Sequence, residues 1–300
     1  FLSRQGLSPA QIRLAAGTNM SYGSNAHDLS MLMGYQSTNL IRSLYDGNSN
    51  FSGGALAAVG GNQRIPEAMA QVLDEAVLTG QLVRAIDVRD DKVVVHVADG
   101  QRFEAPHCIV TVPFSALRHV QLNRYAGPRQ ARAIAELAYT PVFQVHMTPR
   151  FAYWEKDGLP PSMWTDSLAG RCMALRNDPA EPDKVTSCLA FVNGTKAQYL
   201  DRLAPQAAAD AVLADLARLR PATRDAFDVR LVFSWNRSVV AGGAYAYWQP
   251  GQITAFASEL RAAAGRLHFA GEHTAVVNRG MEGAMESGER AAIDVLGQLL

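Results

Sequence analysis

The C-terminal part of the chain carries the pattern that most constrains its fold: a short strand, a loop, and a helix that begins with small residues. Leu267 to Ala270 predicts the strand, and Glu282 to Leu300 predicts the helix, with Gly, Ala and Ser in its first turns. Small residues at a helix start let another group approach the backbone N–H groups at the positive end of the dipole. The pattern predicts either a site for an anionic or electron-rich ligand edge, such as that of a flat ring, or tight helix–sheet packing.

The remainder of the chain predicts helices alternating with strands, as in an α/β protein. Asp99-Gly100 between two apolar stretches is a hairpin signal. The almost continuous apolar run 108–113 is typical of a strand that is covered on both faces in a central sheet. Residues 1–57 predict helices joined by loops, with a flexible link at 46–50. Further helices are expected at 65–73, 128–137 and 205–219, and further strands at 81–88, 92–97, 102–105, 142–148 and 185–192.

Charge and length favour a small-molecule partner. The 28 basic and 28 acidic residues among 300 cancel, so the chain has no basic field to attract nucleic acid or an anionic membrane surface. No run of 18 apolar residues predicts a membrane span. The length suffices for one large domain or two smaller ones, and a start at Phe1 instead of Met predicts a cleaved or trimmed chain.

Few chemical signatures are present in the sequence. The seven histidines show no metal-ligand spacing, and the chain lacks HExxH, GxSxG and a phosphate-binding loop, so we expect no metal. Three widely spaced cysteines, Cys108, Cys172 and Cys188, predict reduced core thiols. The dinucleotide fingerprint GxGxxG is also absent. Aromatic residues gather beside glycines at Trp235 and in 242–251, which predicts either a core corner or an aromatic-walled pocket.

Five segments, taken in order, resemble the flavin-containing amine oxidase family, which includes monoamine, polyamine and L-amino acid oxidases. The first is similar to the family's glycine-pair turn before a helix, the second to its strand ending in Thr-x-Pro, and the others to its late Gly-Gly-x-Tyr segment and its terminal FAD-binding signature. They are Ala58–Pro66, Cys108–Leu117, Gly242–Tyr245 with Pro250-Gly251, Phe269–Glu272, and Gly280–Ala284 with Ser287-Gly288.

The resemblance implies an α/β fold in which a FAD-binding domain is interleaved with an α+β substrate domain. Residues 58–118 and 230–300 would form the FAD-binding part, and residues 1–57 and 119–229 the substrate part. Members of the family begin with a Rossmann unit that carries GxGxxG, and this unit is missing from the chain. The resemblance therefore implies a second chain, from the same precursor, that supplies this unit, with a homo-oligomer of that assembly as a further expectation. The alternatives are a fragment, or a non-enzymatic half that binds FAD only with a partner.

The resemblance also assigns residues to the cofactor. Val83 matches a residue whose backbone contacts the adenine, and Glu272 an acidic residue near the ribityl and phosphate groups. Gly271 and Gly280 belong to the same signature, and Met281 opens the helix whose N–H groups would face the flavin pyrimidine edge.

The implied reaction is oxidative deamination of an amine or L-amino acid. Trp235 and Tyr245 match aromatic residues beside the reacting face of the flavin. In such enzymes a hydride passes from the α-carbon of the amine to flavin N5, oxygen reoxidises the flavin, and the imine hydrolyses. The protein would act in the cytoplasm or after secretion.

Three departures from the family pattern modify these expectations. Ala244 occupies the position of the cysteine that bonds to the flavin in mammalian-type monoamine oxidases, so we expect non-covalent FAD. Gly280 replaces the second ring of the usual aromatic cage, which leaves room for a bulkier or carboxylate-bearing substrate. Arg279 beside it would meet an anion or be solvated. Gln144 aligns with a lysine linked through water to flavin N5, so this neutral amide would orient a water, and oxygen or another acceptor would reoxidise the flavin.

Overall fold

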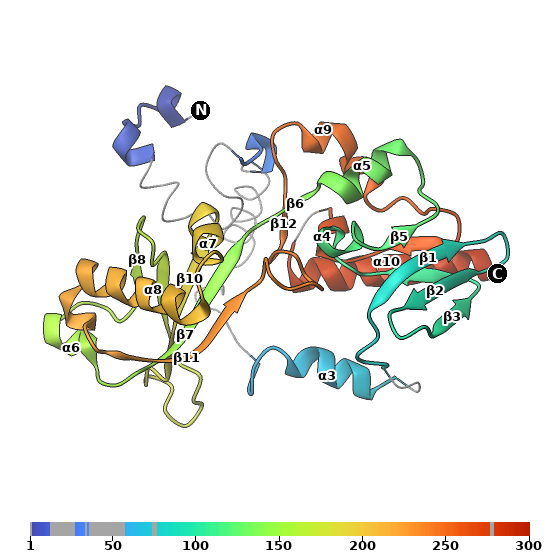
Figure 1. Cartoon of the computed structure of the whole chain (residues 1–300). Coiled ribbons are helices and arrows are strands. Elements are labelled where there is room, and N and C mark those ends of the chain that lie inside the picture. Colours follow the sequence, from blue (N-terminus) through green and yellow to red (C-terminus); the bar gives the residue numbers. More distant parts are fainter. Residues whose placement is uncertain (1, 13–27, 34, 36–57, 74–76, 277–278) are drawn as a thin grey trace, which may run out of the picture. The chain divides into compact units, whose positions relative to one another are not determined.

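A computed structural model describes residues 2–12, 28–33, 35, 58–73, 77–276 and 279–300, and the chain divides into two compact units (Figure 1). Unit 1 comprises Phe1–Leu29 and Tyr139–Ala244, and unit 2 comprises Ser30–Ala138 and Tyr245–Leu300. Most of the predicted helical segment 1–57, including the link at 46–50, lies outside the described residues. Helices and strands are interspersed along the described chain, as the sequence predicts.

Unit 1 is built on a five-stranded sheet in the order β11-β7-β10-β9-β8, in which every neighbouring pair is antiparallel. Side chains of β10 alternate between part-buried and buried positions, so one face of that strand supplies the core. The strands are β7 (Val142–Pro149), β8 (Met163–Trp164), β9 (Arg171–Leu175), β10 (Ser187–Asn193) and β11 (Phe227–Ser234).

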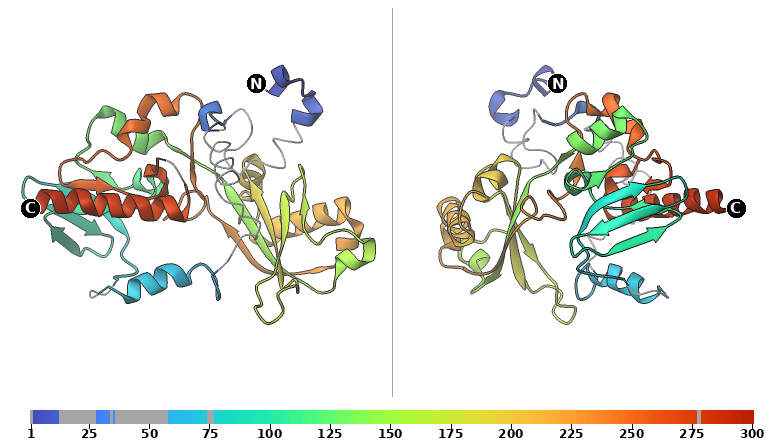
Figure 2. Two further views of the ribbon diagram at one scale, coloured as in Figure 1. Left: turned by 180° about the vertical axis from the view of Figure 1, so that it is seen from behind. Right: turned by 45° about the vertical axis from the view of Figure 1, so that its right-hand side comes forward.

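Helix α8 (Pro205–Leu219) supplies the other half of the unit 1 core (Figure 2). Proline opens its first turn, and its apolar stripe buries Val212 and Leu216 against residues of the strands. The prediction of a helix at 205–219 is therefore confirmed. Short helices complete the unit: η1 (Leu2–Gln5), α6 (Tyr153–Asp157), α7 (Thr195–Leu200) and η2 (Pro221–Thr223).

Unit 2 contains a four-stranded sheet in the order β3-β2-β1-β5. The predicted hairpin turn joins β2 to β3: Gly100 has a φ of 91°, and the N–H of Gln101 donates to Asp99 Oδ1 at 2.9 Å. The strands are β1 (Val83–Val88), β2 (Val93–Val97), β3 (Arg102–Ala105) and β5 (Gln121–Leu122).

A second, parallel pair in unit 2 joins β4 (Cys108–Val110) to β13 (Leu267–Phe269). The predicted strand 108–113 is shorter than expected because Pro113 precedes α4 (Phe114–Leu117) and cannot donate to a ladder. Ile109 is 37% exposed, so the expectation of a strand covered on both faces is wrong within the described residues, where β4 pairs with β13 alone.

Besides α4, unit 2 contains the helices α3 (Arg64–Gln71), α5 (Pro128–Glu136), α9 (Gln252–Phe256), α10 (Met281–Leu299), η3 (Ala257–Glu259) and η4 (Glu272–Thr274). The chain passes between the units at β6 (Ala138–Tyr139), and β12 (Ala246–Tyr247) begins the last segment. Across the described ranges, no helix has the length and apolar character that crossing a membrane requires.

The boundaries of the two compact units differ from the predicted boundaries between the cofactor and substrate parts of the chain. Residues 119–138 belong to unit 2, where Gln130 of α5 donates to the carbonyl of Ala262 at 2.5 Å. Residues 230–244 belong to unit 1, because β11 pairs along β7. The division by function into 58–118 and 230–300 against 1–57 and 119–229 stays a prediction.

Candidate functional site

The turn between β13 and η4 in unit 2 requires glycine at position 271. Gly271 has a φ of 121°, and a Cβ there would lie 2.6 Å from Cε1 of His273, which is too close for any other residue. Ser287 of α10 holds this turn: its Oγ accepts the N–H of Gly271 at 2.8 Å and donates to the carbonyl of Ala284 at 2.8 Å. The small residues of the helix start therefore allow α10 to pack directly against the turn.

Glu272 follows the turn and is largely buried, with its side chain 20% exposed. Its Oε1 accepts the N–H of Ala246 at 2.8 Å, while Oε2 lies 4.0 Å from Nη1 of Arg279. Within the described part of the chain, Oε2 has no hydrogen-bond partner. Burial raises the pKa of Glu272, against the opposing effects of the Ala246 N–H and of Arg279. The carboxylate thus retains a buried acceptor that a ligand hydroxyl would satisfy.

Arg279 is not a solvated arginine, because its side chain is only 9% exposed. Its Nη1 donates to the carbonyl of Ala246 at 2.7 Å, and the guanidinium lies 5.3 Å from the centre of the Trp248 ring. Glu272 and Arg279 therefore hold the N–H and the carbonyl of the same residue, Ala246, which directly follows Tyr245 by one position. The predicted role of Arg279 toward a substrate anion stays a prediction.

The N-terminus of α10 lies at Gly280 and Met281. Gly280 has a φ of 90° and is exposed, with open space around the position of a Cβ. A side chain would be strained there, which explains why glycine occupies the position that the resemblance gives to a second aromatic ring. Met281 is 58% exposed, and no side chain caps the helix. The first N–H groups of α10 would thus be available to a ligand.

Gln144 lies on β7, and Trp235 lies just after the neighbouring strand β11. Their side chains are in contact within unit 1. The indole Nε1 of Trp235 donates to Gln144 Oε1 at 3.3 Å, and the Trp235 ring lies edge-on to Phe233 with centroids 5.1 Å apart. Gln144, which aligns with the family lysine, and Trp235, one of the two aromatic residues that the resemblance places beside the reacting face, are therefore neighbours. Their catalytic role stays a prediction.

Three further predicted positions are Val83, Tyr245 and Ala244. Val83 opens β1 opposite Val97, beside a register shift between Val83 and Ala85. Tyr245 is part-buried and begins the last segment of unit 2. Ala244 donates its N–H to the carbonyl of Thr140 at 3.0 Å, and its methyl group offers no atom that would bond to a cofactor.

Sequence reasoning missed several residues at this site. His273 is buried, and the hydroxyl of Ser287 holds Gly271, whereas the sequence pattern indicates only a small residue at position 287. Trp248, in the aromatic segment 242–251, is buried with its ring 5.3 Å from the Arg279 guanidinium. The one sequence signal that could have indicated His273 is its place as a polar residue in a short loop, between Glu272 and Thr274.

Two histidines without ligand spacing in the sequence, His107 and His268, are neighbours in the structure, with Nδ1 of His107 and Nε2 of His268 3.2 Å apart. Among the described residues, no group of three His, Cys, Asp or Glu side chains forms a candidate metal site.

Comparisons with known proteins support the same family. The model of the flavin-containing amine oxidoreductases matches residues 2–296. A flavin-containing amine oxidase of Danio rerio is 28% identical over 79% of this chain and 46% of its own length. The L-amino-acid oxidase BmooLAAO-I of Bothrops moojeni is 26% identical over 79% of this chain and 49% of its own length.

Solved structures show the same fold. Cyclohexylamine oxidase from Brevibacterium oxydans IH-35A superposes with a TM-score of 0.73 at 18% identity, over 99% of this chain and 66% of that one. The chain spans about half the length of the curated relatives it matches. Since the family model covers almost the whole sequence, the chain belongs to the flavin-containing amine oxidoreductase family.

Proposed function

We propose that the chain is the C-terminal portion of an oxidase that uses FAD to deaminate an amine or an L-amino acid. Its relatives include proteins named for both kinds of substrate, and the substrate range of this chain belongs to the proposal. The observation that carries the proposal is the buried carboxylate of Glu272, whose Oε2 lacks a hydrogen-bond partner in the described structure.

A flavin dinucleotide fits the groups that unit 2 provides. The Oε2 atom of Glu272 would accept a hydrogen bond from a ribityl or ribose hydroxyl. The uncapped N-terminus of α10, at Gly280 and Met281, offers N–H groups and a positive dipole end to an electron-rich ring edge. Gly271 would allow close approach of the backbone, and the backbone of Val83 would contact the adenine. Because Ala244 has no nucleophilic atom, the cofactor would be held without a covalent bond.

When bound, a flavin supplies two-electron acceptance from a carbon–nitrogen bond and reoxidation by oxygen or another acceptor. The side chains of Trp235 and Tyr245 would hold the amine and exclude water from it. The carbonyl of the Gln144 amide is occupied by the Trp235 N–H, which leaves its Nε2 hydrogens to orient a water. As a neutral group, Gln144 would position this water without adding positive charge.

The missing dinucleotide-binding unit is part of the proposal. A second chain that carries GxGxxG would complete the cofactor site. The competing function is a non-enzymatic half that binds FAD only with such a partner. The two differ in a single observable, the reduction of the bound flavin by an amine or amino acid.

Visible absorbance and intact mass spectrometry of the purified protein test this proposal together. We expect the absorbance bands of a flavin, the mass of a second polypeptide, and the release of FAD from the protein on denaturation. A colourless protein without a second polypeptide would contradict the enzyme hypothesis, and FAD that stays attached after denaturation would contradict the role given to Ala244.

Two substitutions separate binding from reaction in the flavin-loaded protein. Glu272→Gln removes the charged acceptor and is expected to weaken FAD retention by about tenfold to a hundredfold, since a hydrogen bond to a charged group contributes about 1.5–3 kcal/mol. Tyr245→Ala is expected to slow flavin reduction by substrate much more than it weakens FAD binding. Tyr125→Ala, at a 40% exposed tyrosine of unit 2, is the matched control and should change neither quantity.

A further inference from the structure

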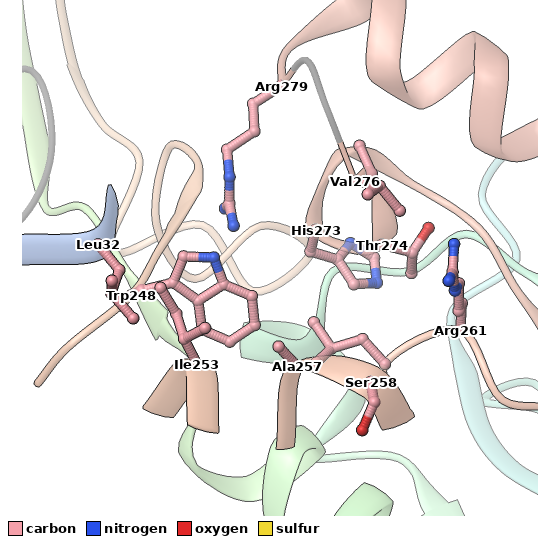
Figure 3. Close-up of a pocket in the computed structure, with 12 residues that line it drawn as sticks. Leu32, Trp248, Ile253, Ala257, Ser258, Arg261, His273, Thr274, Val276 and Arg279 are labelled. Carbon is pink, nitrogen blue, oxygen red and sulfur yellow. The ribbon is translucent and has the colours of Figure 1, made fainter. Parts of the chain in front are cut away.

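A cavity of about 420 Å³ lies within unit 2, in the range of small-molecule pockets (Figure 3). Its walls come from Trp248, which follows β12, with α9 and η3 on one side, and from η4 with the following loop on the other. Trp248 and Ile253 form an apolar wall, and His273, Arg261 and Arg279 supply its nitrogen-bearing groups. Glu272 does not line it, so this cavity is distinct from the carboxylate assigned above to the flavin.

His273 is the feature of this cavity that calls for a ligand. The side chain is 2% exposed, and its Nε2 has no hydrogen-bond partner among the described residues. The ring packs against that of Phe114, with ring centres 4.4 Å apart, and it occupies the space that a side chain at Gly271 would fill. A buried polar atom without a partner costs about 1–3 kcal/mol, so a group that pairs with it is favoured.

The imidazole is uncharged at neutral pH. Burial is the larger cause and the positive charge of Arg279 the smaller one, and together they lower the pKa of His273 to about 3. A neutral ring has one N–H, and in the Nε2–H form the unpartnered atom of this cavity-lining residue is a hydrogen-bond donor.

The cavity has a charged end and an apolar end. Figure 3 shows the imidazole of His273 between Arg261 on one side and the indole of Trp248 on the other. Arg261 is exposed, and no acidic side chain in the described ranges pairs with it. Both permanent charges that line the cavity, on Arg261 and Arg279, are positive, which disfavours an ammonium group and favours an anion.

We propose that this cavity binds a small monocarboxylate with a flat apolar body, its carboxylate on Arg261 and His273 and its body against Trp248 and Ile253. A guanidinium fork and an N–H donor match the two oxygens of a carboxylate. The cavity is larger than an inorganic anion, which would also leave its apolar wall uncovered. A ligand of about ten non-hydrogen atoms with a ring or branched chain would cover that wall. None of the residues that the resemblance assigns to the cofactor lines the cavity, so the proposal does not depend on flavin binding.

Calorimetric titration of the 300-residue chain with phenylacetate tests the site. Arg261→Ala is expected to weaken binding by about tenfold or more, because it removes the charged partner of the carboxylate. Arg129→Ala, at an exposed arginine of α5 outside the cavity, is the matched control and should bind as the parent chain does. 2-Phenylethanol, which keeps the ring without the charge, and acetate, which keeps the charge without the ring, should each bind at least about tenfold more weakly.

Two further variants place the ligand. Ile253→Trp fills the apolar end and is expected to abolish binding, while circular dichroism confirms that the chain is folded. In ¹H–¹⁵N spectra of the histidine rings, the signal that His273→Gln removes should move on titration with phenylacetate. Equal binding of phenylacetate by the parent, Arg261→Ala and Ile253→Trp chains, or a His273 signal that does not move, would overturn the proposal, as would phosphate binding as tightly as phenylacetate.

Discussion

The two units of the chain differ in how completely they pair their buried polar groups. In unit 1 the buried interior is apolar, and its most buried ion pair is fully satisfied: Arg220 makes two contacts of 2.7 Å with the carboxylate of Asp157 and also donates to the carbonyl of Pro160 at 2.8 Å. Among the described residues, unit 1 also has a buried side-chain atom without a hydrogen-bond partner, Oδ1 of Asp201, whereas in unit 2 Gln81, Glu272 and His273 each have such an atom. Unit 1 thus pairs most of its buried polar groups itself, whereas the neighbouring residues Glu272 and His273 of unit 2 both keep atoms that a ligand would satisfy.

The largest effect that this comparison predicts is on the core of unit 1. Leu216 of α8 is fully buried, so Leu216→Ala should lower the free energy of unfolding of unit 1 by about 2–5 kcal/mol through lost apolar contact and a cavity. Leu219→Ala, on the same helix at 39% exposure, should cost less than about 1 kcal/mol.

Urea titration of the 5-fluorotryptophan-labelled protein measures both units at once by ¹⁹F NMR. Trp154, Trp164 and Trp235 report on unit 1, and Trp248 reports on unit 2. If Leu216→Ala shifts the Trp248 transition as much as the others, the units do not unfold separately and the comparison fails.

The next effect concerns the buried charges of unit 2. Arg279→Met removes the donor to Ala246 and the positive neighbour of Glu272, and should cost unit 2 about 2–4 kcal/mol in the flavin-free protein. The double variant with Glu272→Gln should recover a large part of this loss, because the carboxylate is then no longer a buried charge without a neighbour. The Trp248 signal in urea reports both values. Arg129→Met is the control, and additive single effects would show that the two charges do not interact.

The sequence predicted elements well where local pattern decides the structure. Helix 205–219 has an N-terminal proline and a regular apolar stripe, and both signals lie within the segment itself. The strand predicted at 108–113 ended early because Pro113 and the sparse pairing of β4 act against its apolar character. The boundaries of the units depend on contacts such as that of Gln130 with Ala262, 132 residues apart, which no local pattern contains.

The same limit applies to the site. Glu272, Gly271 and Met281 are predicted as site residues through their resemblance to a family motif, whereas the burial of His273 depends on Phe114, which lies on another element. Arg279 was expected to be solvated or to face a substrate, since its contacts with Ala246 and Trp248 arise only from the tertiary fold. A motif therefore predicts which residues occupy a site, and the fold decides which of their atoms remain unpaired.

Acid should unfold the two units over different pH ranges. The pKa of His273 falls from 6.5 to about 3 on folding, so its contribution is complete above pH 6.5 and is lost as the pH falls from there toward 3. The lowered pKa of His268 adds to this loss in unit 2, and the raised pKa of Glu272 opposes it. In unit 1, Arg220 lowers the pKa of Asp157 from 3.8 to about 2, and that contribution is lost only below about pH 4.

The Trp248 signal should therefore change at a higher pH than those of Trp154 and Trp164. His273→Gln should lower the acid midpoint of unit 2 by roughly one pH unit, because glutamine takes up no proton. His146 in unit 1 is part-buried and its pKa is lowered by burial, so it contributes a smaller loss in the same range. Simultaneous acid transitions in the parent chain, or an unchanged midpoint in His273→Gln, would count against the comparison.

The smallest predicted effect is on the hydrogen bond between Trp235 and Gln144, and it tests whether this bond contributes to the stability of unit 1. The bond from Trp235 Nε1 to Gln144 Oε1 is 3.3 Å long and its indole is 36% exposed, so Gln144→Leu should cost unit 1 only about 0.5–1.5 kcal/mol. Trp235→Phe removes the N–H but keeps a ring beside Phe233, and a cycle of the two single variants with the double variant isolates the bond. A coupling above about 2 kcal/mol would make this pair part of the framework of unit 1. A small coupling would leave both side chains free to serve the reaction, because selection for stability alone would not require an amide and an indole at these positions.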